Sequence, residues 1–208
     1  MAFLHFLRLG TLRTCDVIFE TVNYMIDGEK LIEIALESNA THAAILETSK
    51  IEFHEDFRAA CEKNACGKYD ATWSGPPIIG PIKTLIQDVV RFRCGLLFQT
   101  LHRVASSFDM KGMFKAGDIH DAVFRNVLKE IRGKYPEEEL LPLDKGCCSI
   151  CARCAYLDRE PCRNPDQALS SVEAYGMNVI ALQKSAGLPY YGGKNTVLYV
   201  GLILFNKS

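Results

Sequence analysis

The chain has 208 residues, of which 48% are hydrophobic and 24% are charged, and its formal net charge is −1. This composition is typical of a globular domain with a hydrophobic core, and the near-neutral charge gives no electrostatic basis for binding nucleic acid or an anionic membrane. No apolar run in the sequence approaches the roughly 20 residues that a transmembrane helix needs. We therefore expect one ordinary domain with neither nucleic acid nor membrane as a partner.

The start of the chain allows two interpretations. The apolar stretch before Arg8 is too short for a signal peptide, and no small-residue cleavage site follows it. Met25 precedes Asp27, which is a suitable N-cap for a helix. Residues 1–24 are therefore either an N-terminal extension or an ordered leading helix, and we expect a single domain over residues 25–208.

Hydrophobic periodicity and turn residues predict the elements of the first half of the chain. They are a helix over 27–37 with Asp27 as N-cap, short strands over 43–46 and 51–53, and a helix over 54–62. Residues 61–77 are predicted to be irregular, because this segment contains Gly67, Gly75 and the pair Pro76-Pro77.

The second half is predicted to alternate in the same way. Its elements are helices over 84–92 and 118–132, a buried strand over 95–99, a lead-in over 140–143, a helix over 171–186 in one or two pieces, and an interior strand over 196–205. This order predicts an α+β or α/β fold, in which a central mixed sheet flanked by helices supports a C-terminal cysteine-rich metal-binding loop.

The strongest signal is a group of cysteines near the C-terminus. Cys148, Cys151 and Cys154 form a C-x2-C-x2-C motif, and Cys162 follows after seven further residues. Three thiolates at this spacing can surround one compact centre, and a [4Fe–4S] cluster takes four cysteines. The gap before Cys162 is long enough for a loop to return it to the same cluster. These four residues are the predicted metal and cofactor ligands.

Zinc is the alternative metal for these ligands. Structural zinc sites usually use two separated C-x2-C pairs, whereas this motif places three sulfurs together, so the spacing favours iron and sulfide. Five of the nine cysteines lie within residues 147–162. Such clustering indicates thiols that are kept reduced for metal, which predicts a cytoplasmic protein.

Residues beside the quartet have open interpretations. Cys147 breaks the three-residue rhythm and is interpreted as a bystander or as a spare thiol for redox exchange. The Arg163 guanidinium would raise the reduction potential of an anionic cluster, or it is simply solvated or paired with a carboxylate. Cys61 and Cys66 could supply half of a second metal site, or they are buried core thiols.

Two segments resemble the DUF2284 family of predicted metal-binding proteins of anaerobic bacteria and archaea. The first runs from Cys66 to Pro77, and the second runs from Cys148 to Pro165 and continues through Ser171–Val179. The resemblance covers most of the chain after about residue 30 and implies a cysteine-bound metal, with iron–sulfur as the favoured centre. Family members commonly have a cysteine where this chain has Gly75. We therefore expect metal only at the C-terminal quartet, with Trp73 packed near its loop.

Three functions follow from these signals. The first is a [4Fe–4S] protein for electron transfer or redox sensing, which implies a redox partner protein. The second is an iron–sulfur enzyme or maturation factor with its substrate at the cluster, in which Glu173 and Tyr175 would face the metal rather than pack a helix. The third is an interaction module held together by zinc. The sequence assigns no catalytic residue.

Overall fold

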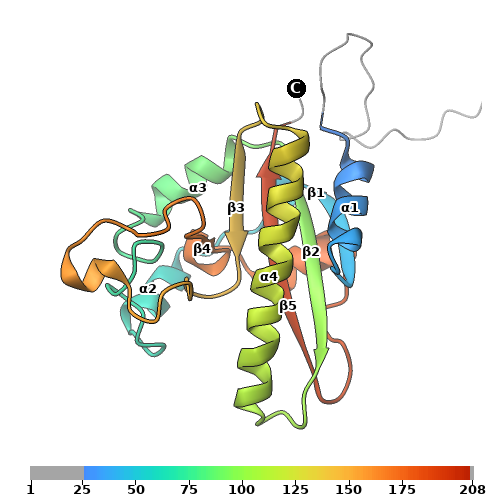
Figure 1. Cartoon of the computed structure of the whole chain (residues 1–208). Helices are drawn as coiled ribbons and strands as arrows, with labels where there is room; N and C mark the ends of the chain where they lie inside the picture. Colours follow the sequence, from blue (N-terminus) through green and yellow to red (C-terminus); the bar gives the residue numbers. More distant parts are fainter. Residues whose placement is uncertain (1–25, 207–208) are drawn as a thin grey trace, which may run out of the picture.

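The computed structural model describes residues 26–206, and within them five strands form one mixed sheet in the order β1-β2-β5-β3-β4 (Figure 1). The strands are β1 (His42–Glu47), β2 (Cys94–Arg103), β3 (Leu140–Asp144), β4 (Ser170–Ser171) and β5 (Thr196–Phe205). β3 and β4 pair in parallel, and the other neighbours pair antiparallel. The central position of β5 confirms the predicted interior strand.

Helices cover the sheet and connect its strands. They are α1 (Gly28–Glu37), α2 (Asp56–Glu62), α3 (Ile82–Val90), α4 (Met110–Lys134) and α5 (Val179–Ser185), with the short 3-10 helices η1 (Thr48–Lys50), η2 (Ala155–Asp158) and η3 (Glu173–Tyr175). This arrangement confirms an α+β fold with a mixed sheet. Within residues 26–206, no helix is both long and apolar enough to cross a membrane.

The sheet is buried on both faces. Along β2, Leu96 and Phe98 point into a core shared with α1 and α4, whereas Leu97 points into a second core shared with α3 and α5. Successive side chains of a strand point to opposite faces, so an almost continuous apolar run serves both cores. For this reason the long apolar runs of β2 and β5 indicate buried strands already in the sequence.

A glycine brings α4 close to the sheet. The rings of Phe124 in α4 and Phe98 in β2 lie 5.3 Å apart, over Gly201 of β5. A Cβ added at Gly201 would lie 2.5 Å from Phe124 and 2.6 Å from Phe98, which is closer than packed atoms approach. Gly201 therefore sets how near α4 lies to the sheet, and with it the position of the polar residues on the preceding turn of that helix.

Several predicted boundaries need correction. α4 begins well before residue 118, because the Asp109 side chain caps it by accepting from the backbone N–H of Gly112 at 2.9 Å. The predicted strand over 51–53 is wrong, since Phe53 makes only an isolated bridge with Met177. Of the two forms expected for the helical segment over 171–186, the structure has the one in two pieces, η3 and α5, and its start is wrong because Ser171 belongs to β4. The interpretation of residues 1–24 lies outside the described residues, so that domain boundary stays a prediction.

The helix cap predicted at Asp27 is confirmed. Its carboxylate accepts a hydrogen bond of 3.0 Å from the backbone N–H of Glu29. This bond satisfies one of the N–H groups that have no partner within a helix.

Candidate metal centre

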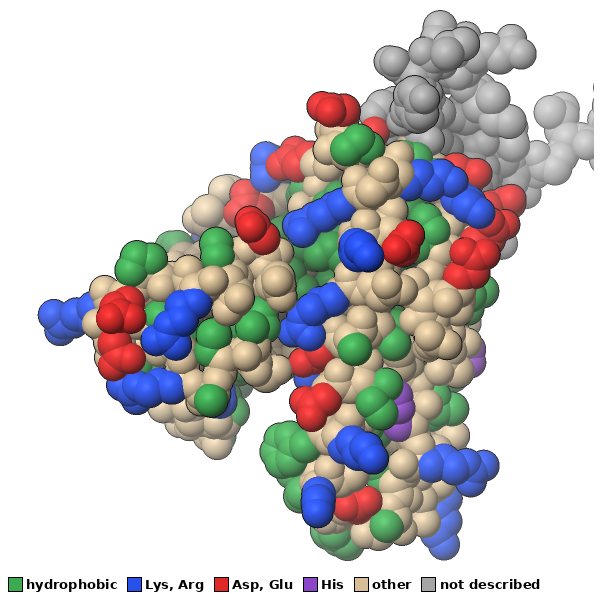
Figure 2. All heavy atoms as spheres, viewed as in Figure 1, with side chains coloured by type: hydrophobic (Ala, Val, Ile, Leu, Met, Phe, Trp, Pro, Cys, Tyr) green, Lys and Arg blue, Asp and Glu red, His purple; other side chains and the backbone are tan. Residues whose placement is uncertain are grey.

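The cysteine loop, residues 145–169, connects β3 to β4 and contains the predicted ligands. Figure 1 shows this loop extending beyond the β4 edge of the sheet, on the same side as α2. In the space-filling view it forms part of a lobe that a hollow separates from the lower part of α4 (Figure 2). The candidate site therefore lies on a projection from the sheet, away from both hydrophobic cores.

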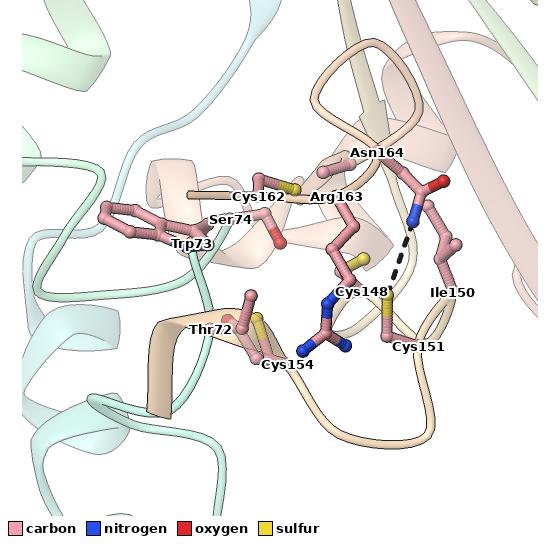
Figure 3. A pocket seen from close by; sticks show the side chains of 12 residues that line it. Thr72, Trp73, Ser74, Cys148, Ile150, Cys151, Cys154, Cys162, Arg163 and Asn164 are labelled. Atoms are coloured by element: carbon pink, nitrogen blue, oxygen red, sulfur yellow. Dashed lines mark hydrogen bonds between the residues drawn. The ribbon is translucent and has the colours of Figure 1, made fainter. Parts of the chain in front are cut away.

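The four predicted ligands line one pocket of this lobe. Cys148, Cys151, Cys154 and Cys162 are half-buried free thiols around a space that residues 72–74 close from the opposite side (Figure 3). Within residues 26–206, no group of three or more His, Cys, Asp or Glu side chains is arranged to hold a single metal ion. The structure thus brings the quartet to one pocket, and its role as a ligand set stays a prediction.

Hydrogen-bond donors point at two of the sulfurs. The Asn164 amide nitrogen donates to Cys151 Sγ at 3.4 Å (Figure 3). The backbone N–H of Ile150 acts on the neighbouring Cys148 in the same direction, and the buried Ser74 hydroxyl, which also lines the pocket, has no hydrogen-bond partner within residues 26–206. Hydrogen bonds to a thiolate stabilise its charged form. Sequence reasoning missed Asn164 and Ser74, although Asn164 lies only two residues after Cys162.

The pKa of the Cys148 thiol lies above its ordinary value. Burial is the largest cause, and the neighbouring thiols of Cys154 and Cys162 raise the pKa further. The nearby Ile150 N–H and Ser74 hydroxyl lower the pKa of this thiol and so act in the opposite direction. Charged thiolates gathered here repel one another, so the pocket favours an occupant that supplies positive charge.

Arg163 borders the pocket and also pairs with a carboxylate. Its guanidinium donates to the backbone oxygen of Arg153 at 3.3 Å and lies 3.6 Å from the Glu160 carboxylate. The interpretation as a carboxylate-paired arginine is therefore confirmed. The same side chain lines the pocket, and its effect on the potential of a cluster stays a prediction. The pairing holds one cation at the mouth of a site lined by sulfur.

The lid loop, residues 66–77, forms the opposite wall of the pocket. The Trp73 indole N–H donates to the backbone oxygen of Glu160 at 2.9 Å, and its ring meets Tyr156 edge-on at 5.2 Å. The Tyr156 hydroxyl donates to Asp70. These contacts confirm the prediction that Trp73 packs near the cysteine loop. They join the lid loop to the cysteine loop, which lies far from it in the sequence.

An ion pair anchors the cysteine loop to α4. The Asp121 carboxylate is 6% exposed, lies 2.9 Å from Lys145 Nζ and accepts from the Ser149 hydroxyl at 3.0 Å. Gly117 leaves room for the lysine, because a Cβ added there would lie 3.1 Å from its ammonium nitrogen. The buried Asp121 carboxylate thus contacts the first turn of the cysteine loop at two residues, Lys145 and Ser149.

The preceding residue of α4 holds the end of β3. His120 is fully buried, and its Nδ1 lies 2.8 Å from the Thr100 hydroxyl while its Nε2 lies 3.2 Å from the Asp144 carboxylate. Asp144 also accepts from the backbone N–H of Lys145 at 2.7 Å. The Nε2 atom makes no hydrogen bond of normal geometry within residues 26–206, but its approach to Asp144 places His120 at the point where the loop leaves the sheet. Sequence reasoning did not select these residues.

Glu173 and Tyr175 are not among the residues that line the pocket. Tyr175 is buried in the core beneath α3, which gives it a packing role. Loss of hydration raises the pKa of the Glu173 carboxyl, and the charge of Asp144 adds to this shift. The structure therefore offers no contact between either residue and the candidate centre.

The remaining free cysteines of the lobe also lie outside the pocket. Cys66 and Cys147 are exposed, and Cys61 is partly exposed. The interpretation of Cys61 and Cys66 as buried core thiols is therefore wrong.

A pocket lined by four cysteines, carried on a loop at the edge of a mixed sheet, is the arrangement expected of a cysteine-rich metal-binding protein. The chain belongs to the DUF2284 family, which is described as predicted metal-binding protein and whose sequence profile matches residues 44–205. The match confirms the resemblance and spans both the lid loop and the cysteine loop. Comparisons with curated proteins and with solved structures found no match.

Proposed function

We propose that Cys148, Cys151, Cys154 and Cys162 hold one [4Fe–4S] cluster that serves electron transfer or redox sensing. The observation that carries this proposal is that all four predicted ligands line one pocket. Each thiolate of a cubane binds a different iron, so the cluster needs four cysteines placed around a space. Cys148, Cys151 and Cys154 lie within seven residues, and Cys162 follows η2 in the sequence.

The polar groups around the sulfurs support this choice of centre. The Asn164 amide donates to the sulfur of Cys151, the backbone N–H of Ile150 lowers the pKa of Cys148, and Arg163 adds a positive charge at the rim. Hydrogen bonds to sulfur and nearby charge are the means by which proteins set the reduction potential of iron–sulfur clusters. When bound, the cluster would supply reversible one-electron exchange.

The position of the pocket suits exchange with another protein. Trp73, which is 36% exposed, forms part of its outer wall, and the Arg163 side chain is about half exposed. We infer that a redox partner protein approaches on this side of the lobe. Cysteine ligands also need a reducing compartment, so the proposal places the protein in the cytoplasm.

Anaerobic purification followed by metal analysis and spectroscopy tests the proposal. We expect a brown protein with iron and acid-labile sulfide in equal amounts and an electron paramagnetic resonance signal that appears on reduction. Colourless protein with about one zinc per chain would show that the pocket holds a structural zinc ion and has no redox function. A substrate that changes the signal on binding would favour the enzyme or maturation factor.

A further inference from the structure

The sheet has an open edge at β1. Among residues 26–206, β1 pairs only with β2, and it lies at the edge of the sheet opposite β4 (Figure 1). Proteins usually protect an edge strand from pairing with other chains by charged residues, by proline or by a covering segment. Residues 42–46 contain no proline and no Asp, Glu, Lys or Arg. Protection of this edge therefore has to come from outside β1.

The backbone groups of Ala43 and Ile45 point towards the open edge. The N–H of Thr48 donates to the carbonyl of Arg93 at 3.0 Å, which makes these residues a hydrogen-bonded pair one step beyond the end of β1. Along two antiparallel strands, such pairs alternate with pairs whose N–H and C=O groups point away from the partner strand. Ala43 and Ile45 occupy the alternate positions, so their N–H and C=O groups are available to a further strand.

A groove of about 600 Å³ lies along this edge. β1 lines it with residues 43–47, the start of α1 lines it with Gly28, Glu29 and Ile32, and the end of α5 lines it with residues 185–187. Because α1 packs on one hydrophobic core and α5 on the other, the groove lies between elements that cover opposite faces of the sheet. This position, in the plane of the sheet, suits one additional strand.

The chain that precedes α1 starts from this groove. Ile26 lines the groove and is 1% exposed, so the 25 residues before it are joined directly to the groove. In the sequence Val-Ile-Phe-Glu-Thr-Val of residues 17–22, every residue except Glu20 is β-branched or aromatic. Such residues favour strands, and the segment has the same length as β1.

We propose that residues 17–22 bind in this groove as a sixth strand, parallel to β1, and close the edge of the sheet. Parallel neighbours need a connection of about a dozen residues or more, which is usually a helix. Residues 23–41 supply that connection and contain α1. The link before α1, residues 23–27, has a length that is common between a strand and a helix.

The position of α1 supports the parallel direction. Gly28, the first residue of α1, packs so closely on Ile45 that a Cβ added to the glycine would lie 3.0 Å from this side chain. The helix therefore begins over the C-terminal half of β1. A preceding strand that is parallel to β1 ends at this same side of the sheet, so a short link can enter the helix. An antiparallel strand would end at the opposite side, near His42.

The proposal is independent of the metal centre. The cysteine loop connects β3 to β4 at the other edge of the sheet, whereas the groove borders β1. Bound residues 17–22 would supply main-chain partners for Ala43 and Ile45, as in recognition of extended peptides by sheet edges. They would also prevent β1 from pairing with β1 of a second copy of the chain.

Nuclear magnetic resonance of the full chain tests the proposal without a substitution. We expect cross-strand contacts between residues 17–22 and β1, and we expect the amides of Ala43 and Ile45 to exchange with solvent at least about tenfold more slowly than unpaired amides. Fast exchange of both amides, or helical contacts within residues 17–22, would overturn the proposal. Protection that disappears on dilution would overturn it by assigning the groove to a second copy of the chain.

Proline variants identify the segment that covers the edge. Proline has no N–H, and successive residues of a strand point their N–H groups in opposite directions, so one of Ile18 and Phe19 has to donate towards β1. At least one of Ile18→Pro and Phe19→Pro should therefore accelerate exchange of the two β1 amides about tenfold, whereas the control Leu9→Pro should not. The amide of Leu202, in the central strand, should stay protected in each variant and report that the fold is intact. Unchanged exchange at β1 in both variants would contradict the proposal.

Discussion

The Ser149 hydroxyl donates a hydrogen bond of 3.0 Å to the Asp121 carboxylate, and this bond joins the candidate metal centre to the longest helix of the fold. Ser149 lies between Cys148 and Cys151, so its position affects two predicted ligands. Asp121 also pairs with Lys145, at the start of the cysteine loop. The geometry of the pocket therefore depends on a residue that does not line it.

Replacement of Asp121 tests this dependence. Asp121→Ala leaves Lys145 without its partner in a largely buried site, and loss of one member of a buried pair costs about 3 kcal/mol of unfolding free energy. Urea unfolding measures this change, and the metal should also leave the variant faster in the presence of a chelator. Asp118→Ala, an exposed position on the same helix, is the control. Equal stability of the two variants would show that the anchor has no energetic role.

The amide of Asn164 is predicted to set the reduction potential. Asn164→Ala removes the hydrogen bond to Cys151. This bond stabilises the reduced cluster more than the oxidised one, because the reduced cluster carries more negative charge. A bond worth about 1 kcal/mol corresponds to a decrease of about 40 mV for one electron. Potentiometric titration measures the shift, and Asn206→Ala, at a residue beyond β5, is the control. An unchanged potential would exclude this role for Asn164.

Trp73 is predicted to slow the loss of metal. Trp73→Phe keeps a ring over the pocket but removes the hydrogen bond to Glu160, which is worth about 1 kcal/mol. Because the lid loop must open before a chelator enters, release should become about fivefold faster. Trp73→Ala should accelerate it further, and the exposed Tyr191→Phe should leave the rate unchanged. Equal rates of metal release in the unchanged chain and the three variants would show that Trp73 does not limit access to the pocket.

The Asp109 cap predicts a pH-dependent contribution to stability. Hydrogen bonds from the backbone N–H groups of Ala105 and Gly112 lower the pKa of this carboxyl below its ordinary value. The stabilisation is therefore present above about pH 4, the pKa in the unfolded chain, and is lost as the pH falls through the lower folded-state pKa. At pH 7, Asp109→Ala should melt about 3 °C lower than the unchanged chain.

The pH profile of the melting temperature shows whether the cap depends on the charge of the Asp109 carboxylate or only on a side-chain acceptor at this position. The difference between the unchanged chain and Asp109→Ala should shrink as the pH falls below about 4. Asp109→Asn keeps an acceptor for the helix N-terminus without a titrating group, so its difference from the unchanged chain should depend on pH and its cap should persist in acid. A pH-independent difference for Asp109→Ala would refute the account.

The strands β2 and β5 could be predicted from sequence because long parts of both are buried on both faces of the sheet. The apolar run over 196–205 has no charged residue to interrupt it, and the structure places it at the centre as β5. The start of α4 could not be predicted in this way, because residues 110–117 include exposed Met110 and Phe114 and two glycines, which obscure the helical period. Only the side-chain bonds of Asp109 identify that end of the helix.

The candidate ligands could be predicted because their spacing is local, whereas the residues that support them come from elsewhere in the chain. The C-x2-C-x2-C motif is visible in seven residues. The positions of Ser74, His120 and Asp121 depend on how the lid loop and α4 pack, and no short pattern encodes them.

The central claim is that the quartet binds one [4Fe–4S] cluster, and iron and acid-labile sulfide per chain after anaerobic reconstitution test it most directly. The unchanged chain should contain about four of each, and Cys162→Ser should lose most of both, because one corner of the cluster then lacks its thiolate. Cys61→Ser, which changes a thiol outside the pocket, should retain the full content. Equal iron and sulfide in Cys162→Ser and the unchanged chain, or zinc in place of iron, would contradict the claim.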